Sequence, residues 1–440
     1  MSRGGSLPLL RDRGDGARAH RHGGARAEQS ADRRRGGVRG RCDLPGRALV
    51  AAGAAAATAM RRAERVGVPF GGHSFPYAPG VLRLSGDPEA VDQRVLEHYR
   101  LWKSHFVRPR GDGSCAVYAP DAAYPYVAEA QGYGMVISAL MAGADPEARD
   151  VFDGILRYVL AHPSSGHPDL HAAQQDGAGR DVGGANSATD GDLDIAYGLL
   201  LADRQWGGGY RASALRRIDA LRETELPAAG GPIKLGDWSS GHFDEVSRTS
   251  DWMPGHFRAF RDVTGDLRWG EALDTHLSLV RALQRQYAPD TGLLPDFVVD
   301  AGSDPKPAPG RVLESEHDGD HHWNACRDPW RIGADAVVSG DARARAAAGR
   351  MGRWMCAATN GDPGRIRCGY RLDGAAYGEG ASGAFVAPFG VAAMAGGGGQ
   401  EWLDALWEWM AASPPEPDRY YAASVQLQAM LVVSHNWWPP

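Results

Sequence analysis

Apolar residues recur three and four positions apart through most of this 440-residue chain, between loops rich in Gly, Pro and Asp. Such spacing is typical of amphipathic helices. It predicts helices near 88–105, 129–143, 146–161, 191–204, 210–222, 254–264, 267–286, 328–338, 341–358, 384–395, 400–411 and 421–433. Strand-like alternation is short, near 115–118 and 296–300. We therefore expect an all-α domain of paired helices whose long loops carry function.

One predicted helix begins with an unusual group of acidic residues. Asp190, Asp192 and Asp194 lie in the sequence Thr-Asp-Gly-Asp-Leu-Asp-Ile-Ala, at the start of an apolar repeat. Acids suit the positive end of a helix dipole, so a well-capped helix is one interpretation. Three neighbouring carboxylates also shift one another's pKa values, which is typical of functional sites. We favour the functional interpretation.

Composition and charge exclude several classes of protein. With 43% hydrophobic residues the chain can bury a large core, and its net charge is −6. Beyond residue 66 it has no basic stripe, which argues against a nucleic-acid partner. No stretch reaches the roughly 20 apolar residues that span a membrane.

The five cysteines form no CxxC pair, so a zinc cage is not expected. The many Trp and Tyr residues suit sugar rings.

The N-terminal segment differs from the rest of the chain. Residues 1–66 are rich in Arg, Gly and Ala and have almost no large apolar side chains, so they cannot form a packed core. Residues 48–59 resemble the apolar part of a secretory signal, although the basic segment before them is very long. We predict an extension over residues 1–70, a catalytic domain over residues 71–440, and a secreted protein.

A second acidic candidate, Glu129, opens the sequence Glu-Ala-Gln-Gly-Tyr-Gly-Met. Together with the motif around Asp190, this sequence resembles glycoside hydrolase family 8. The similarity extends over roughly residues 75–438, in the family's order. Further motifs that carry it are Arg-Thr-Ser-Asp-Trp-Met-Pro-Gly-His-Phe-Arg at 248–258, Asn-Ala-Cys-Arg-Asp-Pro-Trp-Arg-Ile-Gly at 324–333, and the aromatic tail at 420–438.

The resemblance implies an (α/α)6 barrel that cleaves β-1,4-linked glycans internally, with inversion at the anomeric carbon. Inversion needs a general acid on one face of the sugar and a general base on the other. By the resemblance, Glu129 is the acid, and Asp190 grips the distorted sugar at the cleavage point. We expect a polysaccharide substrate, no cofactor, no metal ion and a monomer.

The general base departs from the family's commonest pattern. Many members carry an Asp directly before Ala-Cys-Arg, where this chain has Asn324, and an amide cannot act as a base near neutral pH. A branch of the family that includes chitosanases also has Asn there, with a Glu about ten residues upstream as base. Glu314 stands at that offset. We therefore predict Glu314 as the base, with Glu316 as the fallback and Asp318 or Asp320 as distant alternatives.

Polar residues around this position allow several interpretations. The segment 317–322, His-Asp-Gly-Asp-His-His, has ligands that suit zinc but no recognised spacing, so we favour a polar active-site loop. Arg327 and Arg331 could orient Glu314 or Asn324, or bridge two helices. We predict that Asn324 and Arg327 bind substrate.

Three aromatic residues are candidate stacking platforms for sugars. Tyr133, Trp252 and Trp323 are predicted to bind substrate, although core packing explains each of them equally well. Many relatives carry a tryptophan at position 173, where this chain has Ala173. The substrate prediction therefore lacks one expected contact.

These residues leave two kinds of substrate and two alternative functions open. The leading hypothesis is a hydrolase of chitosan, or of cellulose and other β-glucans. Unpaired acids near the site would attract cationic chitosan, and the candidates are Asp192, Asp194, Glu316, Asp318 and Asp320. A catalytically silent glycan-binding protein that lost its base is the alternative. A helical interaction scaffold would have no acidic, aromatic-lined groove.

Overall fold

The computed structural model describes residues 66–228 and 230–440. The predicted extension, except for residues 66–70, and its signal-like segment lie outside this part of the chain. The described residues form twelve α-helices, close to the predicted positions. These are α2 (Pro88–Phe106), α3 (Ala128–Leu140), α4 (Ala148–Ala161), α5 (Thr189–Trp206), α6 (Tyr210–Thr224), α7 (Pro254–Thr264), α8 (Leu267–Gln286), α9 (Asp328–Ser339), α10 (Ala342–Thr359), α11 (Gly383–Met394), α12 (Gln400–Ala411) and α13 (Tyr420–Val433).

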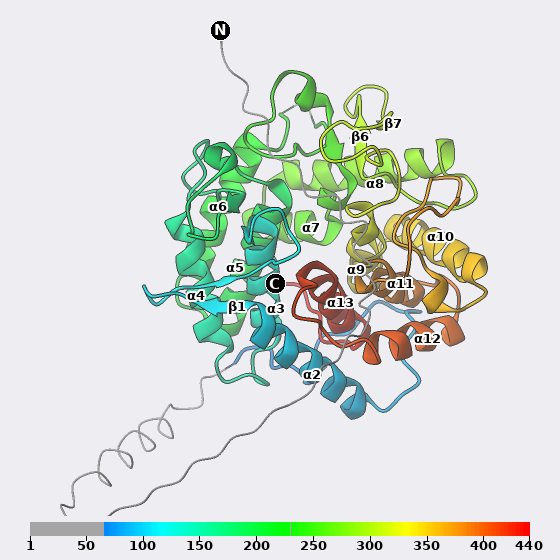
Figure 1. Ribbon diagram of the computed structural model, residues 1–440, viewed down its shortest axis with the longest axis horizontal. Helices are drawn as coiled ribbons and strands as arrows, with labels where there is room; N and C mark the ends of the chain where they lie inside the picture. Colours follow the sequence, from blue (N-terminus) through cyan, green and yellow to red (C-terminus); the bar gives the residue numbers. More distant parts are fainter. Residues whose placement is uncertain (1–65, 229) are drawn as a thin grey trace, which may run out of the picture. The chain divides into compact units, whose positions relative to one another are not determined.

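The helices form two concentric rings. Helices α3, α5, α7, α9, α11 and α13 contact one another in this order, and α13 returns to contact α3 (Figure 1). Each of the other six helices packs on the outside of one or two inner helices. This arrangement confirms the predicted (α/α)6 barrel. Because an outer helix separates successive inner helices, the inner helices run in the same direction and their N-termini meet at one end.

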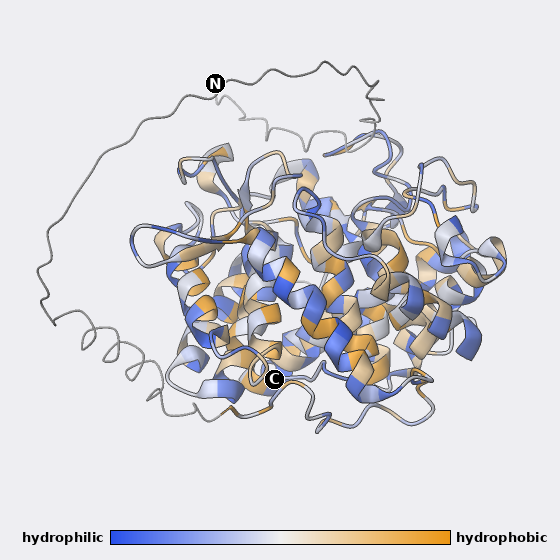
Figure 2. Cartoon of the chain, turned by 60° about the horizontal axis from the view of Figure 1, so that its bottom comes forward, coloured by the Kyte–Doolittle hydropathy of each residue, from blue (hydrophilic) through white to orange (hydrophobic). Residues whose placement is uncertain are grey.

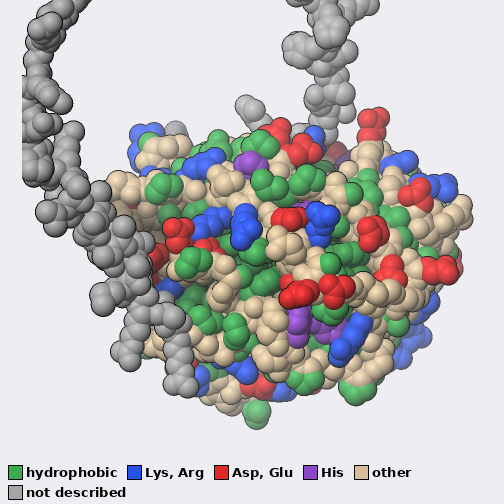
Figure 3. All heavy atoms as spheres, turned by 90° about the horizontal axis from the view of Figure 1, so that it is seen from below, with side chains coloured by type: hydrophobic (Ala, Val, Ile, Leu, Met, Phe, Trp, Pro, Cys, Tyr) green, Lys and Arg blue, Asp and Glu red, His purple; other side chains and the backbone are tan. Residues whose placement is uncertain are grey.

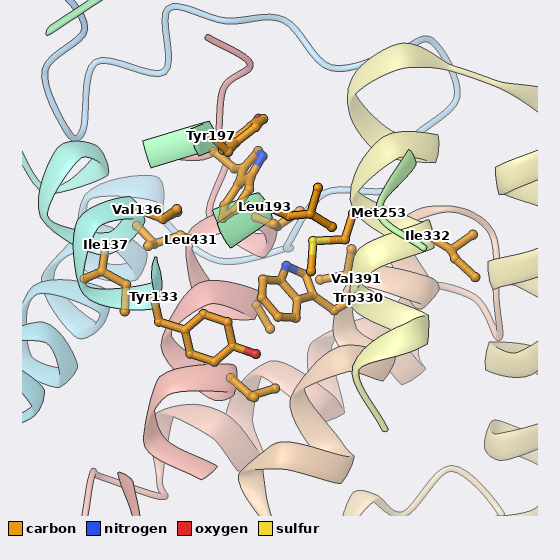
Figure 4. Close-up of a cluster of buried hydrophobic side chains, with 14 of the residues drawn as sticks. Tyr133, Val136, Ile137, Leu193, Tyr197, Met253, Trp330, Ile332, Val391 and Leu431 are labelled. Atoms are coloured by element: carbon orange, nitrogen blue, oxygen red, sulfur yellow. The ribbon is translucent and has the colours of Figure 1, made fainter. Parts of the chain in front are cut away.

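The distribution of apolar residues explains the two rings. Every residue of α11 and every residue of α13 except Ala422 is buried, whereas α4 buries only one face. A helix that is apolar all round is stable only when neighbours cover it on all sides, and an amphipathic helix suits the outside. Hydrophobic stretches accordingly concentrate on the central helices (Figure 2). Side chains from different inner helices meet inside the ring, among them Tyr133, Leu193, Trp330, Val391 and Leu431 (Figure 4).

Two glycines allow α3 and α5 to approach closely. A Cβ atom on Gly132 would lie 2.9 Å from the carbonyl oxygen of Gly191. A Cβ atom on Gly191 would lie 2.5 Å from the Cβ atom of Ala128. Glycine is therefore required wherever these two backbones touch. The close approach brings the first turns of α3 and α5 together, and these turns carry Glu129 and Asp190.

Short antiparallel strands lie in the loops between the helices. β5, β6 and β7 form one three-stranded sheet, and the other strands pair as β1 with β2 and β3 with β4. The two predicted strands correspond to β2 and β6. The strands are β1 (Val107–Pro109), β2 (Cys115–Val117), β3 (Tyr126–Val127), β4 (Gln174–Gln175), β5 (Ser247–Arg248), β6 (Phe297–Val299) and β7 (Lys306–Pro307). The three-stranded sheet matters for function because β5 ends at Arg248 and the loop after β7 carries Glu314.

The surface has a mixed character. On the face shown in Figure 3, acidic, basic and hydrophobic side chains are interspersed. Across the part of the chain that the structure describes, we find no helix with the length and apolar character needed to cross a membrane. The four cysteines in this part, Cys115, Cys326, Cys356 and Cys368, are free thiols. Cys42 lies outside it.

Candidate active site

Glu129 and Asp190 meet at one guanidinium group. Each is the second residue of its helix, α3 or α5. Nη1 of Arg327 donates hydrogen bonds to Oε2 of Glu129 at 3.0 Å and to Oδ2 of Asp190 at 2.9 Å. The Glu129 side chain is 18% exposed, while Asp190 is almost fully buried. A group that approaches this pair from solvent therefore reaches Glu129.

The charge state of Asp190 follows from its neighbours. Burial would raise its pKa, but Arg327 and Arg248 outweigh burial and hold the pKa below its usual value. The backbone N–H of Gly191 also donates to its Oδ1 at 2.9 Å. Asp190 is consequently a carboxylate at neutral pH, held in a fixed position beside Glu129.

Glu314 lies in the loop between β7 and α9, and side chains bind both of its carboxylate oxygens. Arg248 Nη2 donates to Oε1 at 3.0 Å, and Asn324 Nδ2 donates to Oε2 at 2.9 Å. The Glu314 side chain is 17% exposed. The two positions that the sequence analysis connected, 314 and 324, are therefore in direct contact, and this contact depends on how the loop folds.

Two arginines connect Glu314 with the pair on α3 and α5. Nη2 of Arg327 donates to Oδ1 of Asn324 at 3.1 Å. Nη1 of Arg248 lies 3.8 Å from Oδ2 of Asp190. Asn324 therefore accepts from Arg327 and donates to Glu314, a relay that an aspartate could not form because it has no N–H. Three carboxylates, two guanidinium groups and one amide thus form a continuous network.

Arg327 and Asn324 were predicted to bind substrate, and in the structure both contact carboxylates of the site. The Arg327 side chain is 1% exposed and Asn324 is buried. Their polar atoms bind carboxylates, so these two residues position Glu129, Asp190 and Glu314. Of the alternatives for the two arginines, Arg327 orients Asn324, whereas Arg331 bridges helices by pairing with Asp194 of α5.

Asp192 and Asp194 are fully buried structural residues outside this network. Asp192 pairs with Arg217 and accepts the backbone N–H of His171. Asp194 pairs with Arg331 and His256. Burial would raise the pKa of Asp194, but these two partners lower it to about 2. The expectation that Asp192 and Asp194 supply unpaired negative charge is wrong, because each charge already has a cationic partner.

The acids after Glu314 do not supply free charge near the site either. Backbone N–H groups surround the buried carboxylate of Asp318. Asp320 contacts the ring of His317 at 2.9 Å. Glu316 is 76% exposed and lies 3.5 Å from Arg311. The proposed electrostatic attraction of chitosan therefore loses its basis, since these acids have partners too.

Only one of the three predicted stacking platforms is accessible. Tyr133 and Trp252 are fully buried in the core, so neither presents a ring face to a sugar, and the prediction is corrected for both. Figure 4 shows Tyr133 among the apolar side chains inside the ring. Trp323 is partly buried and packs edge-on against Phe385. Trp323 remains a candidate platform next to Asn324.

The segment 317–322 uses its polar groups for internal contacts. His317 pairs with Asp320, and His321 is buried with Nδ1 3.2 Å from the carbonyl oxygen of Leu294. Within residues 66–228 and 230–440, no three His, Cys, Asp or Glu side chains are grouped so as to hold a metal ion.

Sequence reasoning missed two residues of the site. Arg248 opens a motif that was quoted only for its resemblance, and its partner Glu314 lies 66 residues away. Asp296 is buried and accepts the backbone N–H groups of Asn324 at 3.1 Å and Ala325 at 2.7 Å. Burial raises the pKa of Asp296 to about 7, and nearby Glu314 adds to the increase. A lone Asp after a proline gives no sequence signal for this role.

Comparison with known proteins gives consistent matches. Residues 88–435 match the model of the family described as Glycosyl hydrolases family 8. A beta-glucanase of Niallia circulans is 40% identical over 377 residues, which cover 84% of this chain and 91% of that protein. An endoglucanase of Bacillus sp. strain KSM-330 is 34% identical over 367 residues, 80% of this chain and 78% of that protein.

Solved structures agree with these matches. The apo structure of a beta-1,3-1,4-glucanase from Paenibacillus sp. X4 superposes with a TM-score of 0.81 at 40% identity, covering 84% of this chain and 99% of that one. Rex8A from Paenibacillus barcinonensis, complexed with xylose, has a TM-score of 0.66 at 20% identity, covering 80% of this chain and 94% of that one. The second likeness concerns the fold alone.

Proposed function

We propose a specific reaction for this chain, which belongs to glycosyl hydrolases family 8 and is a glycoside hydrolase. In this proposal it cleaves internal β-1,4 bonds of a β-glucan with inversion at the anomeric carbon. The observation that carries this proposal is the placement of Glu314. Its carboxylate is partly exposed, is held by Arg248 and Asn324, and is linked through Arg327 to Glu129. These contacts supply two separate carboxyl groups, as inversion requires.

The two carboxyl groups have complementary tasks. Glu129, as the acid, gives its proton to the glycosidic oxygen while the bond from that oxygen to the anomeric carbon breaks. A water molecule attacks the anomeric carbon from the opposite face and gives a proton to Glu314. Two hydrogen-bond donors orient the carboxylate of Glu314 toward this task. The products are two shorter chains, one with a new reducing end of inverted configuration.

Asp190 has a separate electrostatic role in this proposal. Its buried carboxylate keeps its negative charge through Arg327 and Arg248. The transition state of glycoside hydrolysis carries positive charge on the sugar ring. A fixed negative charge beside the ring stabilises this state more than the ground state, which is the condition for raising the rate.

The silent glycan-binding alternative depends on Asn324 leaving the site without a base. The contact from Asn324 Nδ2 to Glu314 speaks for the active enzyme, because the amide directs a carboxylate into the site. In a protein without hydrolase activity, a partly exposed carboxylate with donors on both oxygens would have no catalytic task. We therefore propose that the base is displaced to position 314 and has not been lost.

For the substrate we propose a neutral β-glucan with β-1,4 bonds, including mixed-linkage β-1,3-1,4-glucan. The names of the similar proteins, beta-glucanase, endoglucanase and beta-1,3-1,4-glucanase, support this class. Chitosan is the second candidate, because the pairing of Asn324 with Glu314 fits the branch that includes chitosanases. We further propose that the protein acts outside the cell, since its substrate is a large polymer. We also propose that it is a monomer.

A reducing-sugar assay over three soluble polymers tests the proposed function. We expect turnover of mixed-linkage β-glucan to exceed that of carboxymethylcellulose and chitosan. Glu314→Gln abolishes turnover on all three, while Glu316→Gln serves as a matched control on the exposed side of the same loop. A preference for chitosan would replace the proposed substrate. Normal turnover by Glu314→Gln would remove the proposed base.

A further inference from the structure

The backbone that carries Glu314 is held by one buried carboxylate. Oδ2 of Asp318 accepts the N–H groups of Val312 and Leu313 at 2.8 Å each and that of Glu314 at 3.0 Å. Oδ1 accepts the N–H group of Ser315 at 2.8 Å. The Asp318 side chain is completely buried. Four consecutive residues thus bind one side chain.

The two oxygens of this carboxylate are used unequally. Each oxygen has about two lone-pair directions, and Oδ2 takes three of the four N–H donors while Oδ1 takes one. Hydrogen bonds from neutral donors to an ionised acceptor are about twice as strong as those between neutral groups. No cationic side chain pairs with Asp318 in the described ion pairs, so backbone dipoles alone compensate its buried charge. Because the side chain is completely buried, bulk water does not reach the carboxylate of Asp318.

The same residue joins the loop to the sheet that carries Arg248. The carbonyl oxygen of Asp318 accepts the N–H of Phe297 on β6 at 2.7 Å. β6 pairs with β5, where Phe297 is the register partner of Arg248. Arg248 in turn donates to Glu314. Asp318 thus binds the backbone beneath Glu314 and also fixes that backbone relative to the arginine that holds the Glu314 side chain.

We propose that Asp318 is a positioning residue for the general base, acting through the main chain of residues 312–315 and without contact to substrate. The inference rests on the proposed function of Glu314. Removing the carboxylate frees four N–H groups and lets the Glu314 side chain leave its position. A displacement of about 1 Å at a reacting group costs on the order of a hundredfold in rate.

Asp318→Asn is the informative variant because it keeps the shape of the side chain. Its NH2 group faces either the N–H of Ser315 or the three N–H groups that Oδ2 binds, so one or three of the four hydrogen bonds are lost. We expect kcat on β-glucan to fall by about tenfold to a hundredfold, with KM nearly unchanged. Asp318→Glu keeps the charge and serves as a second variant should the Asn variant not fold. Asp266→Asn, at the N-terminus of α8 at the other end of the barrel, is the matched control.

Azide separates a positioning role from a general structural one. In Glu314→Ala, azide takes the place of water: it attacks the anomeric carbon, the glycosidic bond breaks, and Glu129 protonates the departing oxygen. This route needs no base. If Asp318 acts only through Glu314, adding Asp318→Asn to Glu314→Ala leaves the azide-dependent rate unchanged.

The outcomes of this experiment are distinct. An azide-dependent rate that falls in the double variant as far as kcat falls in Asp318→Asn alone would overturn the positioning role. Normal kcat in Asp318→Asn would overturn it as well. Failure of azide to restore Glu314→Ala would instead contradict the proposed function, because Glu314 would then not be the base.

Discussion

The candidate site holds its carboxylates on two sides, by different means. Glu129 and Asp190 stand in the first turns of α3 and α5, and helix packing sets their distance through Gly132 and Gly191. Glu314 stands in a loop, where the buried carboxylate of Asp318 holds the backbone through hydrogen bonds. One side is therefore positioned by close contact of apolar and small residues, and the other by polar groups in an irregular segment.

This difference indicates which catalytic positions can move without a change in the barrel. A shift of Glu129 requires a shift of two packed helices, since interiors are close-packed and transmit strain. The loop after β7 is free of that constraint because its shape depends on local hydrogen bonds. A base at position 314 with Asn324 as its donor is thus compatible with an unchanged barrel. The predictions below test each side separately.

The largest effect is expected from removing the two carboxyl groups that we propose as acid and base. Glu129→Gln and Glu314→Gln should each lower kcat on β-glucan by on the order of 10²–10⁴, because each deletes one proton transfer. The melting temperature should stay near that of the wild type. Glu316→Gln should retain near-normal turnover. If Glu316→Gln abolishes turnover and Glu314→Gln does not, the assignment of the base is wrong.

Asp190→Asn tests the electrostatic part of the helical side. We expect kcat to fall by on the order of 10², the size seen when one group that stabilises transition-state charge is removed. KM should change little, because the carboxylate acts on the distorted sugar. Steady-state kinetics on a soluble β-glucan measure both constants. An unchanged kcat with a raised KM would show that Asp190 only binds the ground state.

Gly191→Ala tests the packing part of the same side. Its new methyl group would lie 2.5 Å from the Cβ atom of Ala128, so α3 and α5 must separate. We expect a loss of about 1–3 kcal/mol in the free energy of unfolding, as for other overpacked cores, together with lower activity. Gly255→Ala in α7 meets no atom within 4 Å and is the matched control. Equal melting temperatures for both variants would contradict the packing argument.

The smallest effect is expected from salt. The charged groups of the candidate site are paired with one another, and a neutral glucan carries no charge to screen. We expect kcat/KM on mixed-linkage β-glucan to change less than about twofold between low and moderate ionic strength. A steep decrease for chitosan together with a high rate at low salt would restore the electrostatic argument for that polymer.

The sequence predicted the helical side of the site better than the loop side. Helical spacing gives the starts of α3 and α5, and acids at those starts are visible without a structure. Spacing does not tell a buried aromatic from an exposed one, which is why Tyr133 and Trp252 were misjudged. The partners of Asp192 and Asp194 come from other helices and a loop, and those of Asp318 are backbone groups. Such partners depend on tertiary contacts or loop conformation, which composition and periodicity do not encode.

The most direct test of the account is the product of Glu314→Ala in azide, followed by NMR. The central claim is that Glu314, held in its loop opposite Glu129, activates water on the far face of the sugar. With Glu314 removed and Glu129 intact, azide should restore cleavage and give a glycosyl azide of α configuration, inverted from the β bond. A β-configured azide, or restoration of Glu316→Ala in place of Glu314→Ala, would contradict the claim.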